Sequence, residues 1–123
     1  PGYFVQSTVF DGVTPEMTIA REEIFGPVLA TLTFDDVDEA IARANDSPYG
    51  LTSAIHTASV HRAMTFLDRV RSGVAVVNGG TYGSEPHMPF GGLKESGLGK
   101  EHGLEAMMDH YFETKSVVVG GLS

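Results

Sequence analysis

The stretch REEIFGPV, residues 21–28, sets two adjacent acids and an aromatic ring before a Gly-Pro pair. A proline disfavours the helical conformation for the residue before it, here Gly26. We therefore expect the segment to be extended, and not to be the end of a surface helix.

An extended backbone sends alternate side chains to opposite faces, so Glu23 and Phe25 should share one face while Glu22 and Ile24 share the other. A carboxylate accepts hydrogen bonds from hydroxyl groups, and an aromatic ring packs on a flat group, more strongly when that group is cationic. Glu23 and Phe25 together would suit a ligand that carries a diol and a flat ring. The residues alone leave open a second interpretation, with Phe25 in the core and both acids in water.

Other patterns with possible chemistry fit less well. The chain has no cysteine, which excludes disulfides, thiolate metal sites and a nucleophilic sulfur supplied by this chain. The glycines between 97 and 103 match neither the dinucleotide fingerprint nor the P-loop, so we expect them to serve turns and close packing. The five histidines lack metal-ligand spacing, and no G-x-S-x-G elbow is present.

Composition narrows the class of protein. The 123 residues carry a formal net charge of −8, with a pI of about 4.9, which argues against a nucleic-acid surface. No apolar run reaches membrane-spanning length, and the N-terminus lacks the pattern of a signal peptide. We therefore expect a cytoplasmic protein with no nucleic-acid or membrane partner.

The elements that must position these residues alternate along the chain. Strands are predicted at 3–10, 28–34, 51–57, 74–78 and 115–121, and helices at 35–45, from Ser59 towards Gly73, and around 101–110. This rhythm is typical of an α/β domain with a largely parallel sheet.

The ends of these elements carry recognisable residues. Asp35 or Asp36 can cap the first long helix, which explains this acidic pair better than acid–base chemistry does. Gly73 lies where a C-terminal glycine is expected after the second helix. The strand predicted at 74–78 is apolar from Val74 to Val77 and should be buried on both faces of a sheet. The last strand is also apolar, so we expect a partner to cover it.

Five stretches together resemble a known family. In order between Gly2 and Val119, EEIFGPVL, ANDSPYGLTSAI, GVAVVNG, PFGGLKESGLGKEHG and ETKSVVV are similar to the C-terminal part of the NAD(P)-dependent aldehyde dehydrogenase superfamily. Lys100 stands where the family often has Arg. The resemblance implies that residues 1–112 form the C-terminal part of the catalytic domain and that residues 113–123 form a C-terminal oligomerisation strand.

The resemblance also implies roles for single residues. Glu23 would bind the hydroxyls of the nicotinamide ribose, and Phe25 would contact the nicotinamide region of NAD or NADP. Phe90 would line the tunnel for a small aldehyde substrate, with Tyr82 and His87 as candidates for its mouth.

Family chemistry uses a cysteine thiolate to attack the aldehyde and a glutamate to activate water, and by resemblance both lie upstream of Pro1. We therefore expect the isolated chain to be inactive, and to form a homo-oligomer or associate through its C-terminal strand. The alternative is a stand-alone, non-catalytic protein-interaction module.

Overall fold

The structure, a computed structural model, describes residues 2–82, 85–100 and 102–120, and it has an α/β fold. These described residues form three two-stranded sheets, of which two are parallel and one is antiparallel. The elements in chain order are β1 (Thr8–Phe10), α1 (Thr18–Arg21), β2 (Val28–Ala30), α2 (Val37–Asn45), β3 (Tyr49–Gly50), β4 (Thr52–Ile55), α3 (Val60–Arg69), β5 (Val74–Val77), β6 (Leu93–Lys94) and α4 (Leu104–Tyr111).

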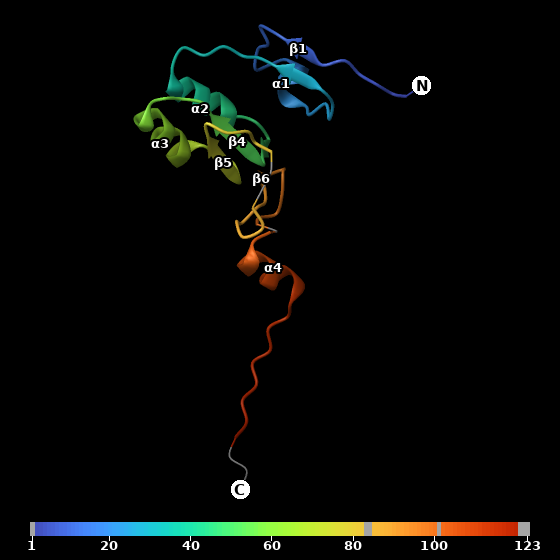
Figure 1. The fold of residues 1–123 in the computed structure, drawn as a ribbon, viewed down its shortest axis with the longest axis vertical. Coiled ribbons are helices and arrows are strands. Elements are labelled where there is room, and N and C mark those ends of the chain that lie inside the picture. The colour runs from blue at the N-terminus through green and yellow to red at the C-terminus, as the bar shows by residue number, and fades with distance from the viewer. Residues whose placement is uncertain (1, 83–84, 101, 121–123) are drawn as a thin grey trace.

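The central unit consists of α2 and α3, which lie side by side against the parallel pair β4–β5 (Figure 1). Its core contains Ile41 of α2 and Phe66 of α3, both buried. The connection from β4 through α3 to β5 is a βαβ unit, as the alternating pattern predicted. The separate strands β1 and β2 pair in parallel, and α1 lies between them in the chain, directly before the segment of Glu23.

Both long helices begin where the sequence predicted. The carboxylate of Asp36, and not that of Asp35, caps α2 by accepting a hydrogen bond from the backbone N–H of Glu39 at 2.9 Å. Glu39 in turn accepts from the backbone N–H of Asp35, and this bond and the bond from the Arg43 guanidinium lower the pKa of Glu39. The Ser59 hydroxyl caps α3 in the same way.

Two expectations around β5 are wrong. Gly73 is not the C-terminal glycine of α3, because the helix ends at Arg69 with Val70 as an extended cap. A side chain at Gly73 would instead lie 1.7 Å from the carbonyl oxygen of Gly91, so the missing side chain allows two backbones to meet. Nor is β5 buried on both faces: it is only half-buried, because among the described residues β4 alone pairs with it.

The Gly-rich stretch, residues 79–99, contains turns in its described part, which leaves out residues 83 and 84. Lys100 donates hydrogen bonds from Nζ to the carbonyl oxygens of Gly73 and Gly91, and Gly91 itself packs against the backbone of Gly99. Phe90 forms an isolated antiparallel bridge with His102, whose ring stacks on it with centroids 5.7 Å apart. Of the glycines expected to serve turns and close packing, Gly97 and Gly103 pack against the backbones of Gly92 and Pro89, whereas Gly99 has open space around it and a φ of +134°.

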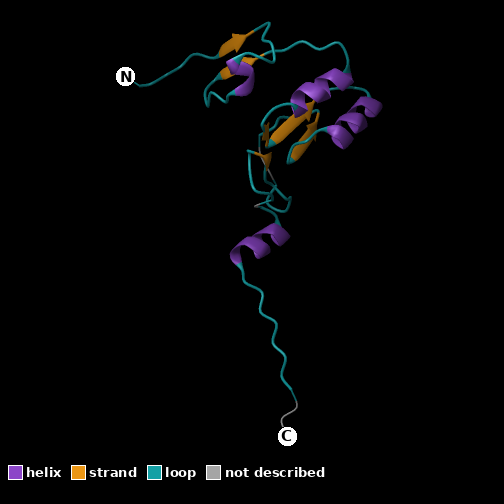
Figure 2. Ribbon diagram, turned by 180° about the vertical axis from the view of Figure 1, so that it is seen from behind, coloured by secondary structure: helices purple, strands orange, loops and turns teal. Residues whose placement is uncertain are grey.

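The C-terminal end projects away from the rest of the molecule (Figure 2). Residues 112–120 are exposed and contain no strand, since no strand in the described part of the chain pairs with them. The predicted strand at 115–121 is therefore not formed in its described part, and Gly121 lies outside the described residues. Among the described residues, no helix has the length and apolar character needed to cross a bilayer.

Candidate functional site

The segment of Glu23 follows directly from a helix end. α1 stops at Arg21, and Glu22 caps it in an extended conformation with φ −107° and ψ 137°. A short helix thus does end here, which the extended interpretation of the whole stretch did not foresee. That interpretation holds at Glu22 but fails at Phe25, where φ is +55°.

Because the backbone at Phe25 is left-handed, the segment turns there, and its side chains do not simply alternate between two faces. The backbone N–H of Val28 donates to the carbonyl oxygen of Gly26 at 2.7 Å, and the carbonyl of Pro27 accepts from Thr8 as β2 joins β1. A bulky residue with positive φ is uncommon and costs conformational energy, and such positions cluster at ligand sites. The sequence pattern gave no signal for it, because Gly26 would be the usual residue to take this conformation.

Glu23 and Phe25 nevertheless lie together. Both line a hollow of about 280 Å³, which we call the loop hollow and which is also lined by Ile19, Glu22, Ile24, Gly26, Val28 and Ala30. The Phe25 side chain is 90% exposed, so the interpretation that buried it in the core is wrong for this chain. Within the described residues no hydrogen bond or ion pair engages the Glu23 carboxylate, which leaves its oxygens free to accept hydroxyl groups.

Glu23 also borders a second hollow of about 380 Å³ rich in hydroxyl groups, here called the hydroxyl hollow. Its hydroxyl-bearing lining residues are Ser47, Tyr49, Thr52, Ser53, Ser72 and Ser96. The guanidinium-bearing Arg71 lines it as well. Ser96 accepts a hydrogen bond from the backbone N–H of Gly50 at 3.0 Å, which is a structural role for this serine.

Phe90 lies elsewhere, beside β5. It lines a hollow of about 470 Å³, here called the strand hollow, with Tyr82, Met88 and the strand residues Val74–Val77. Tyr82 is exposed and borders this hollow, whereas His87 is exposed and does not line it. The structure thus groups Glu23 with Phe25, and Phe90 with Tyr82, in separate hollows.

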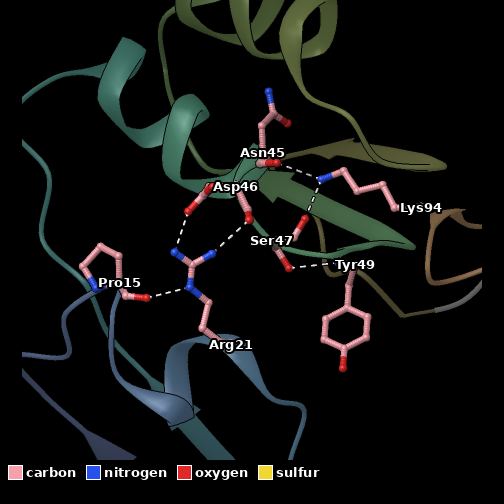
Figure 3. Close-up of polar contacts among 7 residues, drawn as sticks. All are labelled: Pro15, Arg21, Asn45, Asp46, Ser47, Tyr49 and Lys94. Atoms are coloured by element: carbon pink, nitrogen blue, oxygen red, sulfur yellow. Dashed lines mark hydrogen bonds and ion pairs between the residues drawn. The ribbon is translucent and has the colours of Figure 1, made fainter.

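Sequence reasoning missed the contacts that hold the Glu23 segment. Arg21 reaches the end of α2, where its guanidinium pairs with the Asp46 carboxylate at 2.8 Å (Figure 3). Lys94 reaches the same turn from the Gly-rich stretch. A basic residue before two acids gives no signal for its distant partner, because the partner is 25 residues away in sequence.

The residues present are suited to part of a dinucleotide. A carboxylate with free oxygens next to an exposed ring matches a ribose joined to a flat, cationic base. No group of three or more potential metal ligands occurs among the residues that the structure describes.

Comparison with known proteins places the chain in one family. The model of the aldehyde dehydrogenase family matches residues 1–117. A betaine aldehyde dehydrogenase from Rhizobium leguminosarum bv. trifolii is 52% identical over 120 residues, which cover 97% of this chain and 24% of the relative. A betaine aldehyde dehydrogenase from Brucella anthropi is 46% identical over 119 residues, or 96% of this chain and 24% of the relative.

Solved structures show the same similarity. An aldehyde dehydrogenase from Mycobacterium tuberculosis, complexed with NAD+, aligns with a TM-score of 0.81 and 45% identity, covering 88% of this chain and 22% of its own. An indole-3-acetaldehyde dehydrogenase from P. syringae, in complex with NAD+ and IAA, aligns at 0.80 with 49% identity, covering 89% and 22%. The chain spans about a quarter of the length of these proteins. It belongs to the aldehyde dehydrogenase family.

Proposed function

We propose that this chain is the C-terminal portion of an NAD(P)+-dependent enzyme that oxidises a small aldehyde to a carboxylic acid. Residues 1–112 would complete the catalytic domain, and residues 113–123 would form an oligomerisation strand. NAD+ is favoured over NADP+ because two similar structures contain NAD+. A cytoplasmic location and a homo-oligomeric assembly belong to the same proposal.

One observation carries the proposal. Glu23 and Phe25 border one hollow, the carboxylate engages no other described group, and the ring is held outward by a strained backbone. In this role the Glu23 carboxylate accepts hydrogen bonds from the two ribose hydroxyls, and the Phe25 ring packs against the nicotinamide. Bound dinucleotide would supply the hydride acceptor, while this chain orients it. Phe90 would shape the aldehyde site from the strand hollow.

The nucleophile must come from elsewhere, because this chain contains no cysteine. A functional test therefore needs a longer protein. A suitable one is a chimera in which this chain replaces the 120 matched residues of the Rhizobium leguminosarum relative, whose 52% identity favours a native-like junction.

In this chimera we expect Glu23→Gln to raise the Kd for NAD+ by about tenfold or more, since a hydrogen bond to a charged group is worth about 1.5–3 kcal/mol. Calorimetry measures the Kd directly. Glu105→Gln, at an exposed glutamate of α4 that lines neither the loop hollow nor the hydroxyl hollow, is the matched control and should change the Kd less than about twofold. Equal effects of the two variants, or none from either, would show that Glu23 does not bind the ribose.

A second candidate function is a non-catalytic protein-interaction module. The observation in its favour is the amount of exposed apolar surface, including the tail residues Val117–Val119. Stable, specific binding of the isolated chain to an unrelated protein, together with a chimera that fails to bind NAD+, would favour this alternative.

A further inference from the structure

The turn at the end of α2 receives positive charges from two distant segments. Three successive carbonyl oxygens, those of Asn45, Asp46 and Ser47, each accept a hydrogen bond from a cationic side chain (Figure 3). The last carbonyls of a helix have no partner within the helix and form its negative end, so cations stabilise them. The turn is therefore an anchor with two sites.

Arg21 occupies one site and uses all three of its guanidinium nitrogens. Nε donates to the carbonyl of Pro15 at 2.7 Å, Nη1 to the carbonyl of Asp46 at 3.2 Å, and Nη2 pairs with the Asp46 carboxylate at 2.8 Å. This planar, multidentate geometry fixes direction as well as distance, which a lysine could not do. Arg21 is the last residue of α1, two residues before Glu23.

Lys94 occupies the other site. Its Nζ donates to the carbonyls of Asn45 and Ser47, both at 2.9 Å, and the residue has φ +55°. The turn is thus fixed to β6 as well, where Tyr49 pairs with Lys94. Lys94 therefore connects the turn that Arg21 contacts to the folded Gly-rich stretch.

The hydroxyl hollow lies where these segments meet. Its lining includes Glu23 from the segment after α1, Ser47 from the turn and Ser96 from the stretch after β6. Glu23 follows the last residue of α1 by two positions, and Arg21 holds that end of α1 against the turn after α2.

We propose that Arg21 is a positioning residue that places the Glu23 carboxylate for the dinucleotide by anchoring the end of α1 to the Asn45–Ser47 turn. This rests on the proposed function of Glu23. Arg21 lines neither the loop hollow nor the hydroxyl hollow, so its effect on binding passes through Glu23.

The test uses the chimera described above and calorimetric titration with NAD+. Arg21→Gln should raise the Kd for NAD+ by about fivefold to tenfold, because a displaced carboxylate loses part of its hydrogen bonding. Arg69→Gln is the matched control: Arg69 pairs with Asp38 between α3 and α2 and is 45% exposed, against 43% for Arg21. The control should leave the Kd within about twofold.

A double-mutant cycle separates positioning from a general loss of structure. When Glu23 is already Gln, adding Arg21→Gln should change the Kd by less than about twofold, since the carboxylate to be positioned is gone. A full additional loss in that background would overturn the proposal. If Arg21→Gln does not fold, Arg21→Lys provides the test, with a raised Kd expected and an unchanged Kd contradicting the proposal.

The failure of this inference differs from a failure of the proposed function. If Glu23→Gln leaves NAD+ binding unchanged, the assignment of Glu23 fails, and the inference that depends on it fails too. If Glu23→Gln weakens binding while neither Arg21 variant does, only the positioning role is wrong.

Discussion

Phe25 has a backbone conformation that lowers stability, and the proposed function gives its exposed ring a role in binding. A phenylalanine at φ +55° lies in a region that glycine occupies at little cost, and its ring is exposed, so burial does not compensate for the strain. A residue that costs the isolated chain stability and gains it no packing is best explained by a contact with something outside this chain. The nicotinamide group is the contact that the proposed function supplies.

Replacing Phe25 therefore has opposite expected effects on stability and on binding. In the chimera, Phe25→Gly should leave thermal stability unchanged or raise the free energy of unfolding by up to about 1 kcal/mol, because glycine relieves the positive φ. The same variant should weaken NAD+ binding by about threefold to tenfold through loss of the ring.

Phe25→Ala is the matched variant for Phe25→Gly, since it loses the ring but keeps the strained φ. It should weaken NAD+ binding to a similar extent without the gain in stability. Differential scanning calorimetry and titration with NAD+ measure the two quantities. Unchanged NAD+ affinity in both variants would exclude a contact between Phe25 and the nicotinamide.

Among the helices and strands, the sequence predicted correctly those features that depend on residues close together in the chain. The caps at Asp36 and Ser59 and the βαβ unit around α3 could be predicted, because capping and amphipathic periodicity involve residues close in sequence. The strand predicted at 28–34 shrank to Val28–Ala30, and that at 115–121 did not form in its described part. Strand length depends on partners, and those are set by the tertiary structure.

In the candidate site, too, the sequence predicted the local feature and missed those that depend on tertiary structure. The sequence put Glu23 next to Phe25, and the structure groups them in the loop hollow. It did not reveal the turn at Phe25, because the Gly-Pro pair indicated an extended segment. The contacts of Arg21 with the turn after α2 could not be found either. Asp46 is 25 residues away in sequence, and two of the three contacts of Arg21 are to backbone carbonyls, which carry no side-chain signature.

The cap of α2 gives a prediction that belongs to this scale. Asp36→Ala should lower the local opening free energy of α2 by about 1 kcal/mol, which speeds amide hydrogen exchange in Val37–Asn45 about fivefold. Asp35→Ala is the control, because the side chain of Asp35 makes no capping bond and its backbone N–H still donates to Glu39. Equal exchange rates in the two variants would contradict the cap.

At the scale of the whole molecule, the chain exposes more surface than its mass allows for a self-contained domain. A folded monomer of 13.1 kDa is expected to expose about 6,400 Å², whereas this chain exposes 10032 Å². Exposed apolar side chains near both ends of the chain contribute to this excess surface, at Tyr3–Val5 and at Val117–Val119. A surface of this kind is normally covered by other protein, which fits a chain that spans about a quarter of its relatives.

The isolated chain should therefore self-associate, and its apolar tail should take part. An exposed segment with three consecutive valines and free backbone groups is a ready partner for strand pairing. We expect sedimentation velocity to show a concentration-dependent species larger than a monomer. Val118→Lys should shift this equilibrium towards monomer by about tenfold, since burial of a valine is worth about 1.5–3 kcal/mol.

The control for this experiment is Thr114→Lys, which adds the same charge just outside the predicted strand and replaces a residue that is already polar. It should leave the association constant within about twofold, because a single added charge at an exposed site is screened by salt. If both variants dissociate the chain equally, then charge and not strand pairing controls association. A compact monomer at high concentration would mean that the chain covers its own apolar surface in solution, and the partner that this surface implies would then be unnecessary.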